Sequence, residues 1–192
     1  MKTLVFASNN PHKLQEIRTM NPGFNILSLQ DIDFKQDLPE TSGTIEGNAI
    51  QKAQTLNELT GLDCFADDSG LEVNALNGRP GVDSADYAKQ NRNHKANMDK
   101  LLDDLDGCKD RSARFVTVIA LVMNGETHTF GGEVKGNITG DKSGKNGFGY
   151  DPVFIPEGYE KTFGELSPEI KNSISHRANA LAKLSDWLSE NE

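Results

Sequence analysis

The chain has 192 residues, 35% of them hydrophobic and 26% charged, a length and composition that suit one substantial globular core. Its net charge of −9 argues against a general electrostatic attraction to nucleic acid or to an anionic membrane. No apolar run approaches the length of a membrane span or of a signal peptide's core. Because only Cys64 and Cys108 are present, with no CxxC spacing, we expect a reducing, cytoplasmic setting and no zinc–thiolate site.

The first elements in chain order are a strand, a polar turn and a helix. Residues 2–7 (KTLVFA) predict a short buried strand, and either Asn9 or Asn10 can cap a helix that begins at Pro11. This order places backbone N–H groups at the carboxyl edge of a strand, where anions bind in α/β folds. The segment SNNPHK can therefore hold a phosphate, with a positive charge from Lys13, or it can be an ordinary helix cap.

A second strand and a long helix follow. Residues 24–29 predict the strand, and residues 30–43 predict a loop. Residues 44–59 have apolar side chains at helical spacing, with Thr44 as the cap and Gly61 as the end of the helix.

Two adjacent carboxylates interrupt the next apolar segment, FADDSGLEV. Residues 64–66 predict a strand that leads into Asp67 and Asp68. One interpretation is a turn, because Asp, Ser and Gly all favour turns. The other is a divalent metal site, since Mg²⁺ binds one or two carboxylates together with substrate phosphates and water. If the strand geometry persists, the two side chains point opposite ways, so that Asp68 can face a cleft and accept a proton while Asp67 has a structural role.

The remaining elements alternate between helices, strands and Gly-rich loops. The apolar run FVTVIALVM, residues 115–123, is followed by Asn124-Gly125, a strong hairpin signal. This antiparallel pair excludes a purely parallel sheet, and the alternation of elements predicts an α/β fold with a mixed sheet. The other predicted segments are a loop at 74–91, a helix at 95–105, a strand at 127–134, a Gly-rich loop at 135–149, a strand at 150–155 and a helix at 175–188.

The Gly-rich segment GDKSGKNGFGYDP contains a Gly-Lys pair like that of a P-loop, but it does not match the P-loop motif. Only three residues separate Gly140 from Gly144, and Asn146 stands where Ser or Thr should bind magnesium. The segment can instead present Phe148 between two glycines for stacking on a flat base, or it can form a plain turn.

KNSISHR, residues 171–177, contains the last candidate side chains. Lys171 can contact a phosphate, and His176 and Arg177 can donate hydrogen bonds to a base edge or a carbonyl. The alternative is the start of a helix capped by a serine, with the charged side chains in solvent.

Taken together and in order, seven segments resemble the inosine triphosphate pyrophosphatase family over nearly the whole chain. They are SNNPHKLQEI, ETSGTIEGNAIQKA, FADDSGLEV, PGVDSADYA, GFGYDPVF, TFGEL and IKNSISHRANAL. The resemblance implies a house-cleaning enzyme that hydrolyses inosine, deoxyinosine and xanthosine triphosphates to the monophosphate and pyrophosphate. It also implies an elongated mixed β-sheet flanked by helices, with residues 1–192 forming one domain of two lobes around an active-site cleft, usually as a homodimer.

The resemblance assigns roles to individual residues. Asp68 matches the family's catalytic acid, which accepts a proton and works with Mg²⁺, and Glu40 matches a second acid near the metal. The positions that match substrate contacts are Ser8, Asn9, Asn10, Pro11, His12, Lys13 and Lys52 for the phosphates, Ser69, then Phe148, Gly149, Tyr150 and Asp151 for the base, and finally Lys171, His176 and Arg177. Donors from His176 and Arg177 would pair with the carbonyl at position six of hypoxanthine or xanthine and would face an amino donor in adenine.

The chain departs from the family pattern in two places. Asp86 and Lys89 stand where the family's SARYAG segment has Arg and Gly, and Ala178 follows the SHR motif where Gly is common. Two other functions stay open: a pyrophosphatase for modified pyrimidine nucleotides, and a non-catalytic nucleotide-binding protein on the same scaffold.

Overall fold

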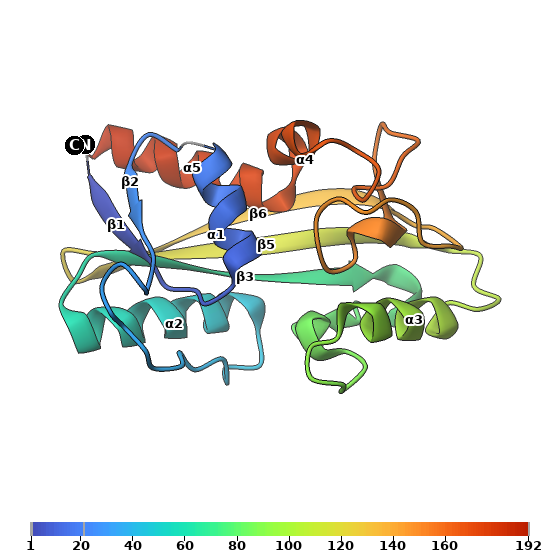
Figure 1. The fold of residues 1–192 in the computed structure, drawn as a ribbon, viewed down its shortest axis with the longest axis horizontal. Coiled ribbons are helices and arrows are strands. Elements are labelled where there is room, and N and C mark those ends of the chain that lie inside the picture. The colour runs from blue at the N-terminus through green and yellow to red at the C-terminus, as the bar shows by residue number, and fades with distance from the viewer. Residues whose placement is uncertain (1, 21, 192) are drawn as a thin grey trace. The chain divides into compact units, whose positions relative to one another are not determined.

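The computed structural model describes residues 2–20 and 22–191, as five α-helices and seven strands joined by short 3₁₀ helices and loops (Figure 1). The helices are α1 (Pro11–Met20), α2 (Ile45–Thr60), α3 (His94–Asp104), α4 (Pro168–Ile174) and α5 (His176–Glu190). The strands are β1 (Thr3–Phe6), β2 (Asn25–Leu27), β3 (Cys64–Val73), β4 (Pro80–Gly81), β5 (Ser112–Met123), β6 (Glu126–Ile138) and β7 (Phe154–Pro156). Within the described ranges, none of the helices has the length and apolar character needed to cross a membrane.

The strands form one mixed sheet. Its order is β2-β1-β3-β5-β6-β7, and β4 pairs with β3. β1 is parallel to both β2 and β3, whereas β4 and β7 run antiparallel to their partners. The two-residue turn Asn124-Gly125 joins β5 to β6, as the hairpin signal predicts. The predicted α/β class with a mixed sheet flanked by helices is therefore confirmed.

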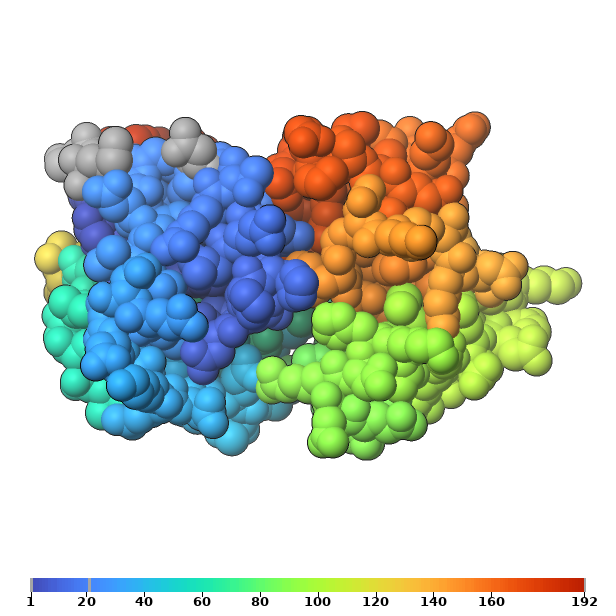
Figure 2. Space-filling view, viewed as in Figure 1, coloured from blue at the N-terminus to red at the C-terminus, as the bar shows by residue number. Residues whose placement is uncertain are grey.

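The chain divides into two compact units. Unit 1 contains residues 1–68, 117–132 and 177–192, and unit 2 contains residues 69–116 and 133–176. Strands β3, β5 and β6 each contribute residues to both units. In the space-filling view, the blue and cyan N-terminal segment forms most of the visible face of unit 1 (Figure 2).

Unit 1 has helices on both faces of its strands (Figure 1). Alternate strand residues belong to two separate cores, because successive side chains of a strand point to opposite faces. Leu4 and Phe6 of β1 pack with residues of α1 and α5, whereas Val5 and Ala7 pack with α2. Both faces are thus buried, which explains why these strands read as continuous apolar runs.

Unit 2 has a single core of its own. It gathers the end of β3, the start of β5, α3 and the segment from β7 to α4. Three aromatic rings pack together in this core, with the ring centroid of Phe115 4.7 Å from that of Phe154 and 6.4 Å from that of Phe163.

Several sequence predictions need correction. The turn interpretation of Asp67 and Asp68 is wrong, because β3 continues through both residues to Val73. The predicted strand at 150–155 begins only at Phe154, after a short 3₁₀ helix. The predicted loop at 74–91 contains β4 and two 3₁₀ turns.

Candidate active site

The alternation of β3 separates the two adjacent carboxylates. Phe65 faces α1 and α5, and Cys64 and Ala66 face α2. Two residues beyond Phe65, Asp67 also faces α1 and α5, and Asp68 faces α2. One strand therefore delivers one carboxylate to each layer of helices.

Asp67 is fully buried among cations. Its carboxylate accepts hydrogen bonds from Lys13 Nζ of α1 and from Arg177 Nε of α5, both at 3.0 Å. Arg177 is also buried and pairs with Glu16 of α1. Burial alone would raise the pKa of Asp67, but the ammonium of Lys13 and the guanidinium of Arg177 outweigh it and hold that pKa well below its usual range. Asp67 therefore stays ionised and joins three elements.

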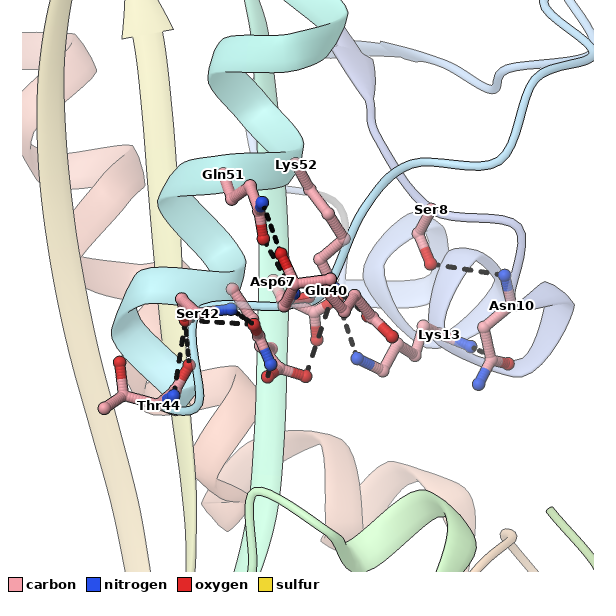
Figure 3. Close-up of polar contacts among 12 residues, drawn as sticks. Ser8, Asn10, Lys13, Glu40, Ser42, Thr44, Gln51, Lys52 and Asp67 are labelled. Carbon is pink, nitrogen blue, oxygen red and sulfur yellow. Dashed lines mark hydrogen bonds and ion pairs between the residues drawn. The ribbon is translucent and has the colours of Figure 1, made fainter.

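Asp68 is partly exposed and lies beside Lys52. Figure 3 shows Lys52 reaching toward Glu40. Lys52 Nζ of α2 is 3.9 Å from Asp68 Oδ1, 2.6 Å from Glu40 Oε1 and 2.8 Å from the carbonyl oxygen of Asp67. The Asn48 amide donates to Asp68 Oδ2 at 3.1 Å. Burial raises the pKa of Asp68 above its ordinary value, although Lys52, Lys13 and Asn48 act in the opposite direction. A carboxylate whose ionised form is disfavoured in this way is suited to accept a proton.

The donor set around Lys52 fits a magnesium ion. Glu40 and Asp68 both bring carboxylate oxygens toward the Lys52 ammonium, and both side chains are partly exposed. Mg²⁺ binds through one or two carboxylates and completes its shell with water and substrate phosphates. Among residues 2–20 and 22–191, no three His, Cys, Asp or Glu side chains gather into a closed metal cage. The carboxylates of Glu40 and Asp68 would suit a metal ion whose shell is completed by water and substrate phosphates.

The turn before α1 is built as a helix cap. Asn10 Oδ1 accepts hydrogen bonds from the backbone N–H groups of His12 and Lys13 at 3.0 and 3.3 Å, and Ser8 Oγ accepts one from Asn10 N–H. Pro11 is the first helical residue, as predicted, and Asn10 is the cap. Contacts of Ser8, Asn9 or Lys13 with a triphosphate stay predictions.

In unit 2, Phe148 lies in a turn held by a buried ion pair. Asp151 Oδ2 accepts hydrogen bonds from Phe148 N–H at 2.7 Å and from Lys171 Nζ at 2.6 Å. The Lys171 ammonium lies 4.9 Å from the centroid of the Phe148 ring. A side chain at Gly147, where φ is +72°, would meet Asp151 Oδ2 at 1.9 Å. Glycine is therefore required next to the aromatic ring.

The other predicted residues of unit 2 are placed mainly by packing. Tyr150 is buried, and its hydroxyl donates to the carbonyl oxygen of Ser84 at 2.9 Å. His176 is buried and stacks on Phe115, with ring centroids 4.8 Å apart. Gly149 N–H donates to His94 Nδ1 at 3.4 Å, and Ser69 is partly exposed on β3.

Comparison with known proteins identifies the family. The model of the Ham1 family matches residues 4–187. This chain belongs to the Ham1 family. Proteins named dITP/XTP pyrophosphatase are 55% identical in Flavobacterium johnsoniae, over 96% of this chain and 97% of that protein, and 50% identical in Porphyromonas gingivalis, over 98% of both. The resemblance inferred from the seven segments is thereby confirmed.

Solved Ham1 structures show the same fold. The Staphylococcus aureus Ham1 protein superposes with a TM-score of 0.90 at 42% identity, covering 100% of both chains. A HAM1 protein from Coxiella burnetii also gives a TM-score of 0.90, at 40% identity, covering 99% of this chain and 100% of the other.

The two departures within the SARYAG segment have a local structural context. Lys89 has a φ of +54°, in the left-handed region that glycine adopts most easily, so this Ham1 chain keeps a glycine-like backbone with a lysine. Asp86 accepts a hydrogen bond from the backbone N–H of Arg92 at 3.0 Å. Both residues therefore belong to a structured loop.

Sequence reasoning missed Asn48 and His94. Asn48 is buried on the apolar face of α2, one turn before Lys52. A polar residue at a position where the helical pattern places apolar residues could have identified Asn48 as a candidate site residue. His94 gave no signal in the sequence, since its neighbour Gly149 is 55 residues away.

Proposed function

We propose that this Ham1 protein hydrolyses inosine, deoxyinosine and xanthosine triphosphates to the nucleoside monophosphate and pyrophosphate. The proposal is supported by relatives named dITP/XTP pyrophosphatase that are 43–55% identical over nearly the whole chain. The single structural observation that supports it best is the division of the aspartate pair. Asp67 pairs with Lys13 and with the buried Arg177, whereas Asp68 lies partly exposed beside Lys52 and Glu40.

The proposed mechanism needs no covalent intermediate. Asp68 accepts a proton from a water molecule, whose oxygen bonds to the α-phosphorus while the bond to the bridging oxygen of pyrophosphate breaks. Lys52 and Lys13 stabilise negative charge on the phosphates. Glu40 and Asp68 would hold Mg²⁺, which when bound neutralises phosphate charge and lowers the pKa of water.

The base is proposed to bind at residues of unit 2. Phe148 would stack on the purine, because its turn is fixed by Asp151 and Gly147. His176 of unit 2 is proposed as a donor toward the carbonyl at position six. Arg177, which belongs to unit 1 and pairs there with Asp67 and Glu16, stays a predicted substrate contact. A hydrogen-bonding site of this kind would reject adenine because donors would be left unpaired.

Two finer proposals concern the state of the protein. We propose a cytoplasmic location, supported by Cys64 and Cys108, which are both free thiols. We also propose a homodimer, on family resemblance alone, which light scattering in solution would test.

The proposed activity is tested by measuring pyrophosphate release with Mg²⁺ from the triphosphates of inosine, xanthosine, deoxyinosine, guanosine, adenosine and deoxyuridine. The wild type should prefer the inosine, deoxyinosine and xanthosine substrates. Asp68→Asn should lose at least ~100-fold in rate, as expected for removal of a general base, and still bind substrate. The exposed control Asp37→Asn should match the wild type. Preference for deoxyuridine triphosphate would favour a pyrimidine enzyme, and full activity of Asp68→Asn would overturn the role of that residue.

A further inference from the structure

Asn48 connects α2 to the carboxylate of Asp68. Asn48 is only 5% exposed, so both ends of its side-chain amide need hydrogen-bond partners. The amide nitrogen donates to Asp68 Oδ2 at 3.1 Å, and the amide oxygen accepts from Ser42 N–H at 3.1 Å and from Ser42 Oγ at 3.0 Å.

These partners fix which way the amide points. The backbone N–H of Ser42 is a donor only, so it requires the oxygen of Asn48 on its side. The nitrogen of the same amide must then face Asp68, whose ionised carboxylate is an acceptor only. The amide therefore cannot flip without placing donor against donor at Ser42 and acceptor against acceptor at Asp68.

Gly47 allows Ser42 to reach this position. A side chain at Gly47 would place its Cβ 2.4 Å from Ser42 Oγ and 2.7 Å from Ser42 Cβ, so Ser42 would have to move. The Thr44 cap accepts from Gly47 N–H at 3.0 Å and fixes the same helical turn. Ser42 and Thr44 lie together on the loop that enters α2 (Figure 3).

We propose that Asn48 is a positioning residue for Asp68, with an amide orientation imposed by Ser42 through the space that Gly47 leaves. Asn48 holds Oδ2 of Asp68 and thereby sets the plane of the carboxylate, while Oδ1 lies 3.9 Å from Lys52 Nζ. This role rests on the proposed function, since it concerns the carboxylate that accepts the proton. A misplaced base of this kind lowers kcat more than it weakens substrate binding.

The decisive variant is Asn48→Asp, which keeps the shape and the acceptor for Ser42 but replaces the donor to Asp68 by a carboxylate oxygen. It should lower kcat by about 10- to 100-fold, the size expected for a base displaced by about 1 Å, with KM changed less than about threefold. Mn²⁺ affinity without substrate, measured by electron paramagnetic resonance, should not weaken, because a carboxylate is added. Gln54→Glu is the matched control, since it makes the same amide-to-carboxylate change on the exposed side of α2 and should leave kcat unchanged.

A second variant keeps the test decisive if Asn48→Asp does not fold. Gly47→Ala leaves Asn48 and Asp68 unaltered but crowds Ser42 and also the cap hydroxyl Thr44 Oγ1, 2.8 Å from the added Cβ. Because Ser42 must move, this variant should lower kcat with little change in KM. A folded Asn48→Asp variant with the kcat of the wild type would overturn the positioning role. If Asn48→Asp does not fold, the kcat of the wild type in Gly47→Ala would overturn it instead. If wild type and Gln54→Glu both fail to hydrolyse the triphosphates, the proposed function itself is wrong, so the two failures are distinguishable.

Discussion

Asp67 and Asp68 are neighbours in the chain, yet their carboxylates have opposite surroundings. Asp67 has a lowered pKa because two cations lie against it, and Asp68 has a raised pKa chiefly because it is desolvated. Strand alternation alone produces this difference, since it sends one side chain to α1 and α5 and the other to α2. Two substitutions to asparagine should therefore have opposite effects on stability.

Asp67→Asn should destabilise the protein by about 3–5 kcal/mol, because Lys13 and Arg177 would lose a buried anionic partner. The free energy of unfolding in urea measures this loss. Asp33→Asn is the control, since Asp33 pairs with Lys35 on the exposed surface and such pairs contribute little. The buried pairing would be contradicted if both variants unfolded at the same urea concentration as the wild type.

Asp68→Asn should stabilise the protein at neutral pH, in contrast to its neighbour. The folded pKa of Asp68 is raised, so protonated Asp68 favours the folded state at low pH, and this advantage disappears as pH rises through the folded pKa. Replacing the carboxylate removes the penalty for burying its charge. Unfolding curves at pH 7 and pH 3 should show a stabilisation that is larger at pH 7. A loss of stability at pH 7 would mean that Asp68 is well solvated or well paired.

At the scale of elements, local signals predicted α2 and the hairpin well. Thr44 and Gly61 are the caps of α2 in the structure, and Asn124-Gly125 forms the turn. Helix α4 was missed because it has seven residues and too few turns to show a periodic pattern, although Ser167 before Pro168 is a typical helix start. The sequence predicted the strand only as far as residue 66, whereas β3 continues to Val73. Two aspartates and a glycine disfavour a strand locally, and only burial against α1, α5 and α2 overrides that preference.

The end of α2 offers a test of this local control. Gly61 has a φ of +69°, and its N–H donates to the carbonyl oxygen of Asn57. Gly61→Ala should cost about 1 kcal/mol, since a side chain is strained in the left-handed region. Gly140→Ala is the control, because no atom lies within 4 Å of the added Cβ and φ is not positive there. Equal melting temperatures for the two variants would show that this cap contributes nothing.

At the scale of the whole molecule, the site depends on contacts between distant parts of the sequence. Asp67 meets Lys13 across 54 positions and Arg177 across 110. Individual motifs each predicted a phosphate, metal or base contact. Only the resemblance of all seven segments, in order, to one family connected these contacts to a single reaction. The burial of Arg177 against Asp67 could not be predicted in this way, because it requires the packing of α1, α5 and β3 together.

The reaction itself is tested most directly by hydrolysing inosine triphosphate in ¹⁸O-labelled water with Mg²⁺ and analysing both products by mass spectrometry. Water attack at the α-phosphorus predicts equal amounts of inosine monophosphate and pyrophosphate, with one ¹⁸O atom in the monophosphate and none in pyrophosphate. Label in pyrophosphate, or formation of inosine diphosphate and orthophosphate, would contradict the account.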